Sequence, residues 1–505
     1  MKNKYALLSV SDKAGIKELS ENLIAAGYSI ISTGGTAKRL KEFGLEPVEV
    51  KDFARFPEIF DGRVKTLQPE IFGGILMRRD SEKDILEAEK NNISAIDVVC
   101  VNLYPFPQVV KKSDATLQDK IENIDIGGPS LIRAAAKNYK FVSVLTSPEQ
   151  YNEFAEKLAS GNLSLNFREK LAAEAFAHTA KYDAVIADFF EENFLGEKKN
   201  FRLNFPLTRK LRYGENPHQQ AFIYGEFENY FDILHGKELS YNNIIDLIAA
   251  VNLSEELGEN AVAIIKHTNP AGAALRNTVF ESYLAALSGD PVSSFGGIVS
   301  VNGTVNAETA EKLNEIFLEI IVAKDFTESA FRILKKKKNR RLLKLLGLPP
   351  VEKTFKSIPG GILVQDFDDS DANQIEFRQV SNNLPKKSYI NDLKFAWIIG
   401  KHVKSNAIAI TKDMKILGIG AGQMSRVDSA KIAVSKAKEH GHDLSDSVAS
   451  SDAFFPFPDG LEVLADAGVK FIVEPGGSKR DEEVINAANE RGVALYFTGI
   501  RNFKH

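Results

Sequence analysis

Lys266 and His267 stand side by side at the end of the apolar run AVAII, just before an Asn-Pro pair. An imidazole can exchange a proton near pH 7, and an ammonium group can stabilise negative charge that develops on a carbonyl oxygen. Neighbouring side chains of a regular strand point to opposite faces. Both can therefore reach one site only if the strand ends there, and we expect Asn269-Pro270 to end it. The alternative is a histidine bonded into a strand cap beside a surface lysine, and the small residues 271–273 argue against it because they leave room for a ligand.

Three loops near the N-terminus have the composition of phosphate-binding loops. They are SVSDKAG (9–15), STGGTAKRL (32–40) and GRVKT (62–66). Glycines between a strand and a helix let backbone N–H groups converge on an anion, and a helix N-terminus favours negative charge. Each loop alone could equally be an ordinary strand-to-helix turn, with Thr36 as the helix cap. Together, at the carboxyl edge of one parallel sheet, they favour a phosphorylated small molecule.

Three further segments carry polar or glycine-rich patterns. In LRYGENPHQ, Arg212 followed by Tyr213 could clamp a phosphate and a ring. SDAFFPFPDG (451–460) could line a flat-ring pocket with Asp452 as its one carboxylate, or it could be a core loop. GIGAGQMSR (418–426) lacks the glycine spacing and the following acidic residue of a dinucleotide fingerprint, which argues against a nicotinamide cofactor.

Short apolar runs alternate with helical patterns along the chain, which predicts an α/β fold with a doubly wound parallel sheet in its first part. A long helix is expected at about 167–190, and the polar stretch after it favours a domain boundary near residue 198. The runs AVAIIKH, GGIVSVN, NAIAITKD, KFIVEP and VALYFTG then predict strands of a second α/β region. The sequence thus predicts two domains, residues 1–198 and 199–505.

Composition excludes several classes of protein. The 505 residues carry a net charge of −4, which argues against nucleic acid or an anionic membrane as a partner, and we expect the basic run LKKKKNRRLLKLLG (334–347) to be a solvated face. No apolar run approaches the roughly 20 residues of a membrane span, and the first residues do not resemble a signal peptide. The one cysteine, Cys100, cannot build a disulfide framework or a multi-cysteine metal site, and no zinc-deaminase motif is present. We expect a soluble cytoplasmic protein without a catalytic metal.

A series of segments, in order along essentially the whole chain, carries a family resemblance. They are SVSDKAG, STGGTAKRL, GRVKTL, NLYPF, IDIGGPSLIRAAAKN, LRYGENPHQ, KHTNPAG, SSFGG, GIGAGQMSR, SDAFFPFPDG and FTGIRNFKH. On these segments the chain resembles the bifunctional AICAR transformylase/IMP cyclohydrolase family. The resemblance implies formyl transfer from 10-formyltetrahydrofolate to AICAR, giving FAICAR, and dehydrative ring closure of FAICAR to IMP. It assigns ring closure to residues 1–198 and formyl transfer to residues 199–505.

The same resemblance implies a fold and an assembly. The first domain would be a methylglyoxal-synthase-like doubly wound parallel sheet, and the second would contain two cytidine-deaminase-like α/β units without zinc. The chain would form a homodimer with transformylase sites shared across the interface. A structural monovalent cation is a further ligand that the resemblance allows.

For formyl transfer, the resemblance makes His267 the general base for the amine proton and Lys266 the group that stabilises the oxyanion, with Asn406 orienting the site. The residues implied to hold AICAR are Arg212, Tyr213, Gly296, Glu319, Arg426 and Arg501. Those implied to contact the folate are Asp452, Gly476 and Gly477.

For ring closure, the residues implied to bind phosphate and ribose are Ser11, Lys13, Thr33, Gly34, Gly35, Thr36, Arg63 and Thr66. Those implied to grip the base are Asn102, Asp125 and Gly127. The proton transfers are assigned to Lys65, Tyr104, Asp125 and Lys137, with Lys137 as the first choice.

Two positions depart from the family pattern: Gln68 stands where histidine is common, and Ala271 where cysteine is common. Neither position has an essential role in this interpretation. The main rival hypothesis is a one-activity enzyme whose first domain only binds nucleotide as a regulatory module. The set Lys65, Tyr104, Asp125 and Lys137 argues against it, because a binding module does not need all four. A dinucleotide-dependent oxidoreductase is the second rival.

Overall fold

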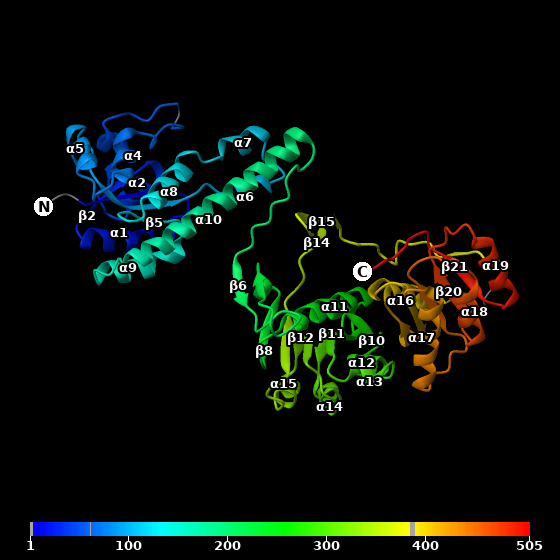
Figure 1. The fold of residues 1–505 in the computed structure, drawn as a ribbon. Coiled ribbons are helices and arrows are strands. Elements are labelled where there is room, and N and C mark those ends of the chain that lie inside the picture. The colour runs from blue at the N-terminus through cyan, green and yellow to red at the C-terminus, as the bar shows by residue number, and fades with distance from the viewer. Residues whose placement is uncertain (1–3, 61, 384–388) are drawn as a thin grey trace. The chain divides into compact units, whose positions relative to one another are not determined.

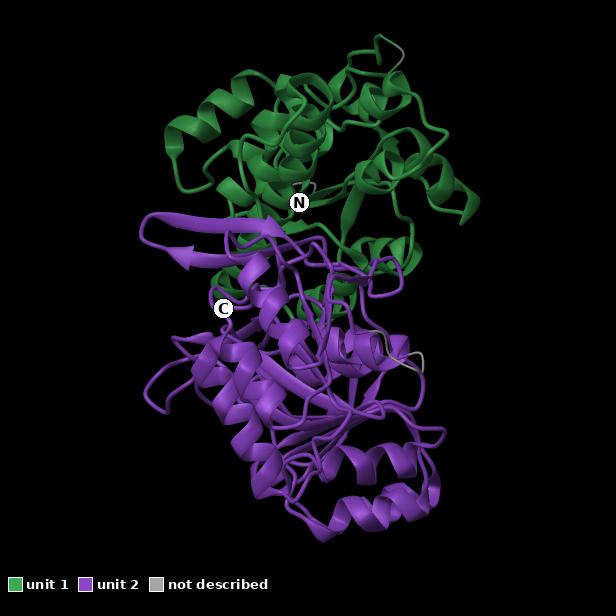
Figure 2. Ribbon diagram, turned by 90° about the vertical axis from the view of Figure 1, so that its right-hand side faces the viewer, with its two compact units in different colours: residues 1–204 green, residues 205–505 purple. Residues whose placement is uncertain are grey.

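The computed structural model describes residues 4–60, 62–383 and 389–505, which form two compact units (Figures 1 and 2). Unit 1 ends at Asn204 and unit 2 begins at Phe205. None of the helices in the described ranges is long and apolar enough to cross a membrane. Each unit is built around its own sheet and its own hydrophobic clusters.

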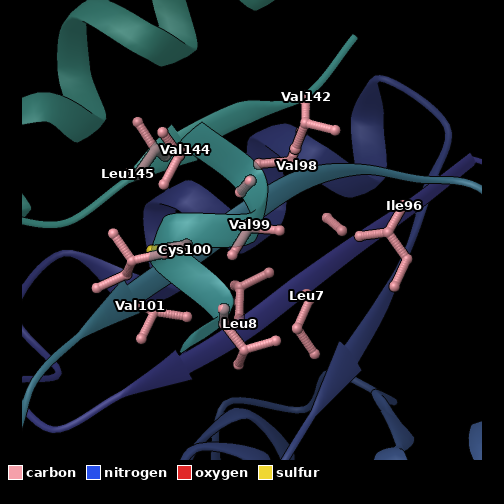
Figure 3. Packing of buried hydrophobic residues seen from close by; sticks show 14 of the residues in the cluster. Leu7, Leu8, Ile96, Val98, Val99, Cys100, Val101, Val142, Val144 and Leu145 are labelled. Carbon is pink, nitrogen blue, oxygen red and sulfur yellow. The ribbon is translucent and has the colours of Figure 1, made fainter. Parts of the chain in front are cut away.

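The sheet of unit 1 has five described strands in the order β3-β2-β1-β4-β5, all of them parallel. They are β1 (Lys4–Val10), β2 (Tyr28–Ser32), β3 (Val48–Glu49), β4 (Ile96–Asn102) and β5 (Ser143–Leu145). Helices cover both faces of a parallel sheet, and so its central strands are apolar throughout. Figure 3 shows the resulting core, where Leu7 and Leu8 of β1 pack beside Val98, Val99 and Cys100 of β4.

The helices of unit 1 connect these strands and extend beyond them. They are α1 (Ile16–Ala25), α2 (Gly34–Glu42), α3 (Val50–Ala54), α4 (Pro69–Leu76), α5 (Glu82–Lys90), α6 (Phe106–Val110), α7 (Leu117–Glu122), α8 (Gly127–Lys137), the 3-10 turn η1 (Pro148–Gln150), α9 (Tyr151–Ala159), α10 (Leu165–Phe190) and the π-helical turn η2 (Glu191–Leu195). The chain leaves β1 toward β2 on one side and later adds β4 on the other. The strand order therefore reverses between β1 and β4, which is where open α/β sheets bind ligands outside their carboxyl ends.

Unit 2 contains one 12-stranded mixed sheet in the order β16-β21-β20-β19-β17-β18-β10-β9-β11-β12-β13-β8, counted over the described residues. Its strands are β8 (Phe231–His235), β9 (Val262–Lys266), β10 (Asn269–Ala274), β11 (Ile298–Val305), β12 (Ile320–Phe326), β13 (Arg341–Leu345), β16 (Arg378–Gln379), β17 (Ile408–Lys412), β18 (Lys415–Gly420), β19 (Val448–Ser451), β20 (Phe471–Glu474) and β21 (Ala494–Phe497). Two further pairs form separate hairpins: β6 (Leu207–Lys210) with β7 (Phe222–Tyr224), and β14 (Lys353–Ile358) with β15 (Gly361–Asp366).

The helices of unit 2 lie on both faces of this sheet. They are the 3-10 turn η3 (Phe227–Asn229), α11 (Tyr241–Leu257), α12 (Val279–Leu287), α13 (Pro291–Ser294), α14 (Ala307–Glu315), α15 (Glu328–Leu334), α16 (Ile390–His402), α17 (Arg426–Glu439), α18 (Asp459–Asp466) and α19 (Asp481–Glu490). One apolar cluster joins α11 and α16 to the middle of the sheet. Two others join α12, α14 and α15 to one half and α17, α18 and α19 to the other half.

The large sheet is an internal repeat. In the first half, an antiparallel hairpin, β9–β10, is followed by the parallel strands β11, β12 and β13 and is closed by an antiparallel edge strand, β8. In the second half, β17–β18, β19, β20, β21 and β16 repeat the same order and the same directions. The two halves join where β10 pairs with β18, antiparallel, at Ala274 and Lys415.

This topology places the ends of several strands at one edge of the sheet. Because β10 and β18 run antiparallel, the carboxyl ends of β9 and β18 lie at the same edge, with the start of β10 between them. The starts of β11, β12, β13 and β17 and the carboxyl ends of β19, β20 and β21 reach that edge as well. We call it the site edge.

The expected strand end after Lys266 is present, but Asn269-Pro270 does not form it. His267 and Thr268 have φ values of 50° and 63°, and Asn269 pairs with Lys266, so the chain turns in a two-residue hairpin loop. Positive φ at both central residues is the geometry of a type I′ turn, which matches the twist of the flanking strands. Asn269 and Pro270 instead begin β10.

Candidate active sites

A cavity of about 680 Å³ lies outside the carboxyl ends of β1, β2 and β4 in unit 1. It brings together most of the residues that the sequence singled out for this domain. Those that line it are Ser11, Lys13, Thr33, Gly34, Gly35, Thr36, Arg63, Lys65, Thr66, Asn102, Tyr104, Asp125 and Gly127.

One end of this cavity is built to hold an anion. Helix α2 begins at Gly34, and the ammonium groups of Lys65 and Lys13 lie 3.7 and 4.0 Å from the points where side chains of Gly34 and Gly35 would start. A helix N-terminus and two ammonium groups all favour negative charge. Because Gly34 and Gly35 have no side chains, the space beside the two ammonium groups stays open, as a phosphate requires.

Two of the residues predicted to bind the substrate form hydrogen bonds to the protein backbone. The Thr36 hydroxyl accepts from the Val10 N–H and donates to the Val10 carbonyl, both at 3.0 Å, and the cap position of α2 belongs to Thr33. Thr36 is therefore not the helix cap that the sequence suggested. Asn102 accepts from the N–H groups of Ser11 and Asp12 and donates to the Asp12 carbonyl, so its amide holds the first phosphate loop in place.

Asp125 lines the same cavity, two residues before the start of α8. Its Oδ1 accepts from the Gly128 N–H at 2.7 Å, and its own N–H donates to the Tyr182 hydroxyl at 2.9 Å. Burial raises the pKa of the Asp125 carboxyl, and the bond from Gly128 partly opposes that effect. A carboxyl group whose pKa is raised toward neutrality is suited to take up and return a proton.

Lys137 does not reach this cavity. It is the last residue of α8, ten residues after Gly127, which places it about 15 Å further along the helix axis. It lines a separate, mainly apolar hollow of about 620 Å³ between α4, α8 and α10, together with Phe72 and Phe176. Lys137, the first choice for the proton-transfer residue, thus lies away from the cavity that the other predicted residues of unit 1 line.

In unit 2, the Lys266–His267 pair occupies a hairpin at the site edge. Lys266 donates to the Phe295 carbonyl at 3.0 Å, and a side chain on Gly296 would begin 2.9 Å from its ammonium nitrogen. Gly296 has φ 71°, so glycine is favoured here by both conformation and space. His267 is exposed at the tip of the turn. The structure thus brings Lys266 and Gly296, two of the predicted site residues, close together.

Glu319 lies at the same edge but is engaged by a buried arginine. Its Oε2 accepts from Arg341 at 2.7 Å, and Arg341 also donates to the Glu238 carbonyl. Within the basic run 334–347, Lys335, Lys336 and Lys338 are exposed, as expected for a solvated face, whereas Arg340 and Arg341 are only 1% and 5% exposed. These two arginines donate to backbone carbonyls and side chains of unit 2, and so they have a structural role.

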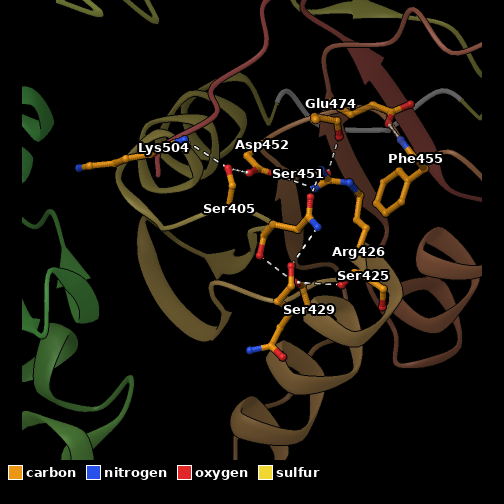
Figure 4. A network of polar contacts seen from close by, with 12 residues as sticks. Ser405, Ser425, Arg426, Ser429, Ser451, Asp452, Phe455, Glu474 and Lys504 are labelled. Atoms are coloured by element: carbon orange, nitrogen blue, oxygen red, sulfur yellow. Dashed lines mark hydrogen bonds and ion pairs between the residues drawn. The ribbon is translucent and has the colours of Figure 1, made fainter. Parts of the chain in front are cut away.

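A second cavity at the site edge, of about 530 Å³, is lined by Asn406, Arg426 and Arg501. Arg426 is 7% exposed and donates to Asn406 Oδ1 and to Ser451 Oγ, both at 2.9 Å. It also forms an ion pair with Asp452, whose other oxygen accepts from Ser405 (Figure 4). This network fixes the orientation of the Asn406 amide. The same amide donates to two backbone carbonyls of the loop that follows β18.

The structure does not place the predicted folate residues in this cavity. Asp452 is 1% exposed, its carboxylate is paired with Arg426, and it does not line the cavity. Gly476 and Gly477 form the turn after β20 and do not line it. Asp459, at the start of α18, does line it. The proline before Asp459 was the signal that this carboxylate begins a helix at the end of the aromatic segment.

Asn269 connects the hairpin to the second cavity. Its Nδ2 donates to the His267 carbonyl at 3.1 Å, and its Oδ1 accepts from the Lys404 N–H at 3.0 Å, two residues before Asn406. Arg212 and Tyr213 form a pair of their own in the segment after β6, with a 2.9 Å hydrogen bond, and they line neither cavity. The site edge thus unites the Lys-His pair with Asn406, while Arg212 and Tyr213 are not among the residues that line the two cavities.

A cavity with two ammonium groups at a helix N-terminus in one unit and a Lys-His pair beside an arginine-lined cavity in the other are features of a two-site enzyme that handles phosphorylated small molecules. A family model described as AICARFT/IMPCHase bienzyme matches residues 135–436, and one described as MGS-like domain matches residues 15–130. The chain belongs to the AICARFT/IMPCHase bienzyme family.

Relatives support this membership over the full length. The bifunctional purine biosynthesis protein PurH of Persephonella marina is 49% identical, and those of Thermoanaerobacter sp. and Aquifex aeolicus are 47% and 48% identical. Each alignment covers 99% of this chain and 100% of the relative. A crystal structure of ForH is similar at 35% identity and a TM-score of 0.35, covering 38% of this chain and 99% of that one.

The chain is therefore a bifunctional enzyme with AICAR formyltransferase and IMP cyclohydrolase activities, which are the last two steps of IMP synthesis. Its family uses formyltetrahydrofolate as the formyl donor. Unit 1 has the MGS-like fold. In the described residues, no three His, Cys, Asp or Glu side chains gather in a way that could hold a metal ion.

Proposed function

We propose that unit 1 closes the purine ring and unit 2 transfers the formyl group. The cavity of unit 1 combines an anion-binding end with the carboxyl group of Asp125, as expected for a substrate with a phosphate and a reacting carboxamide. The site edge of unit 2 carries the Lys-His pair. The observation that carries the assignment is this separation of the two sets of reactive groups into different units.

For formyl transfer, we propose that His267 removes a proton from the exocyclic amine as its nitrogen attacks the formyl carbon of 10-formyltetrahydrofolate. Lys266 stabilises the oxygen of the tetrahedral intermediate, and its ammonium group is already held by the Phe295 carbonyl. The intermediate then collapses, the bond to N10 of the folate breaks, and that nitrogen takes up a proton. Asn406, held by Arg426, orients the reacting groups.

For ring closure, we propose that the carboxamide nitrogen of FAICAR attacks its formyl carbon and that the resulting hydroxyl leaves as water. Lys13, Lys65 and the start of α2 bind the phosphate end. Asp125 and Tyr104 line the cavity beyond it and exchange the protons. We assign Lys65 to both phosphate binding and proton transfer, since its ammonium group lies 3.7 Å from the position of a Gly34 side chain and the residue lines the same cavity as Asp125.

We also propose a homodimer in which the transformylase sites are shared. The hairpin β14–β15 supports it: Ile358, Leu363 and Val364 are 42%, 60% and 41% exposed on strands with little cover from the rest of the unit. Isolated two-stranded hairpins are marginal in water, so a second copy is the natural cover.

Two finer assignments complete the proposal. A structural monovalent cation remains an additional ligand suggested by the family resemblance, to be tested by the dependence of activity on potassium. The one cysteine, Cys100, is buried and unpaired, in keeping with a protein that works in the cytoplasm without disulfides.

Two full-length variants test the division of labour. His267→Ala should lower formyl transfer about 10²–10⁴-fold while still converting supplied FAICAR to IMP. Lys65→Met should show the converse and accumulate FAICAR from AICAR and 10-formyltetrahydrofolate. Tetrahydrofolate and IMP are followed separately. Loss of both activities in either variant, with its melting temperature unchanged, would contradict the assignment.

A further inference from the structure

The catalytic hairpin has a counterpart in the second half of the repeat. The turn Lys266-His267-Thr268-Asn269 corresponds to Lys412-Asp413-Met414-Lys415, where Asp413 and Met414 have φ values of 48° and 50°. In both turns, the second residue is exposed and the other three are half-buried. The second turn lies at the edge opposite the site edge, because its strand β18 runs antiparallel to β10.

The lysines of the two turns make the same contact. Lys266 donates to the carbonyl of Phe295 at 3.0 Å, and Lys412 donates to the carbonyl of Ser445 at 2.7 Å. Each carbonyl stands just before the strand that follows the hairpin in the sheet order. The position of the lysine ammonium is therefore a property of the repeated scaffold and is independent of catalysis.

Each turn is also held by an aspartate from the helix that precedes its hairpin. Asp246 of α11 accepts from the Thr268 N–H at 2.7 Å, and Asp392 of α16 accepts from the Met414 N–H at 2.9 Å. In each turn, this N–H belongs to the third residue, which directly follows the exposed residue. A β-branched residue such as Thr268 is unfavourable at positive φ, so the turn needs an external contact to keep this conformation.

We propose that Asp246 is a positioning residue for formyl transfer: by accepting the Thr268 N–H, it keeps the turn in the conformation that presents His267 at the site edge. This inference rests on the proposed role of His267. In this role Asp246 acts only as a hydrogen-bond acceptor toward the backbone of the turn. Asp392 makes the same bond at the opposite edge, where Asp413 stands in place of the histidine. Asp392 therefore has a structural role only.

The repeat supplies a matched control for the test. Asp246→Ala and Asp392→Ala each remove one acceptor from the same kind of turn. We expect Asp246→Ala to lower kcat of formyl transfer about 10²-fold with a smaller change in KM for AICAR, since misplacement of a catalytic group by about 1 Å has that effect. Asp392→Ala should keep kcat within about twofold, at a similar loss in melting temperature.

A conservative variant distinguishes positioning from charge. Asp246→Asn retains an acceptor oxygen and should restore most of kcat. Ring closure of supplied FAICAR, measured in the same preparations, should be unchanged in all three variants. An Asp246→Ala variant with normal kcat, or equal losses in Asp246→Ala and Asp392→Ala, would overturn the inference.

His267→Ala separates this outcome from a failure of the proposed function. If His267→Ala loses formyl transfer while Asp246→Ala does not, only the positioning role of Asp246 is wrong. If His267→Ala retains formyl transfer, the role of the Lys-His pair is wrong, and the inference falls with it.

Discussion

At the scale of single residues, the sites are built by side chains whose polar atoms are largely committed to the scaffold. Asn102 and Thr36 hold phosphate loops, and Asp452 holds Arg426, which in turn orients Asn406. The groups left to act on a substrate are few. This arrangement favours rigidity of the reacting groups, which transition-state stabilisation requires.

Lys137 allows a direct test of the cavity of unit 1. Because its position on α8 is about 15 Å from Gly127, Lys137→Met should retain ring closure within a few-fold, whereas Lys65→Met should reduce it about 10²-fold or more. The measurement is IMP formation from supplied FAICAR. A loss of ring closure in Lys137→Met, in a protein with unchanged melting temperature, would show that the lysine does reach a cyclohydrolase site.

Glu474 makes the stability of the protein depend on pH. It is 1% exposed, its Oε2 accepts from the Phe455 N–H, and burial raises its pKa to about 8 from an ordinary 4.5, with Asp481 adding to the increase and Arg426 opposing it. Between those two values the folded chain holds a proton that the unfolded chain has released. Stability should therefore fall as pH rises from about 4.5 to 8.

Glu474→Gln removes this dependence, because its neutral amide keeps the acceptor and cannot ionise. We expect the variant to match the wild type near pH 5 and to be more stable by a few kcal/mol at pH 8.5. Chemical denaturation across that pH range measures the effect. Parallel pH profiles for the two proteins would mean that Glu474 is ionised in the folded chain.

At the scale of elements, glycines set how closely helices approach the large sheet. A side chain on Gly420 of β18 would begin 1.9 Å from the Ser429 carbonyl oxygen of α17, and one on Gly418 would begin 2.2 Å from that of Ala433. The segment GIGAGQMSR is therefore a packing motif that lets α17 lie against β18. Its resemblance to a dinucleotide fingerprint has this physical origin.

Gly420→Ala should accordingly destabilise unit 2 by about 3 kcal/mol or more, because backbone on both sides must move. Gly361→Ala is the matched control: the added methyl group meets no atom within 4 Å, and the change should cost little. Thermal unfolding followed by circular dichroism compares them. Equal melting temperatures for the two variants would show that the strand and helix can separate at no cost.

Local patterns predicted the elements well because strands and helices are encoded over a few residues. The run YALLSV and the helix around 167–190 correspond to β1 and α10, and the phosphate loops meet in one cavity as the strand order requires. The hairpin at His267-Thr268 was missed because Thr268 is β-branched, and β-branched residues rarely adopt positive φ. Asp246 was missed because its importance depends on a contact that no local pattern encodes. Comparing AIIKHTN with AITKDMK would have revealed the repeat.

At the scale of the whole molecule, assembly should depend on the hairpin β14–β15. Leu363→Asp places a charge on its most exposed aliphatic side chain and should shift sedimentation from dimer toward monomer. Formyl transfer should fall with the dimer population, while ring closure, which needs only the cavity of unit 1, should persist. A wild-type chain that sediments as a monomer at concentrations where both activities are full would contradict the shared site.

The single cysteine has a practical consequence for spectroscopy. Cys100 is 1% exposed, its thiol donates to the Tyr151 hydroxyl, and burial raises its pKa to about 12, so the reactive thiolate is scarce at neutral pH. Met424, by contrast, is 99% exposed on the rim of the 530 Å³ cavity. A Met424→Cys variant would therefore accept a maleimide fluorophore at one position, without removal of the native thiol, and would report ligand arrival at that rim in real time.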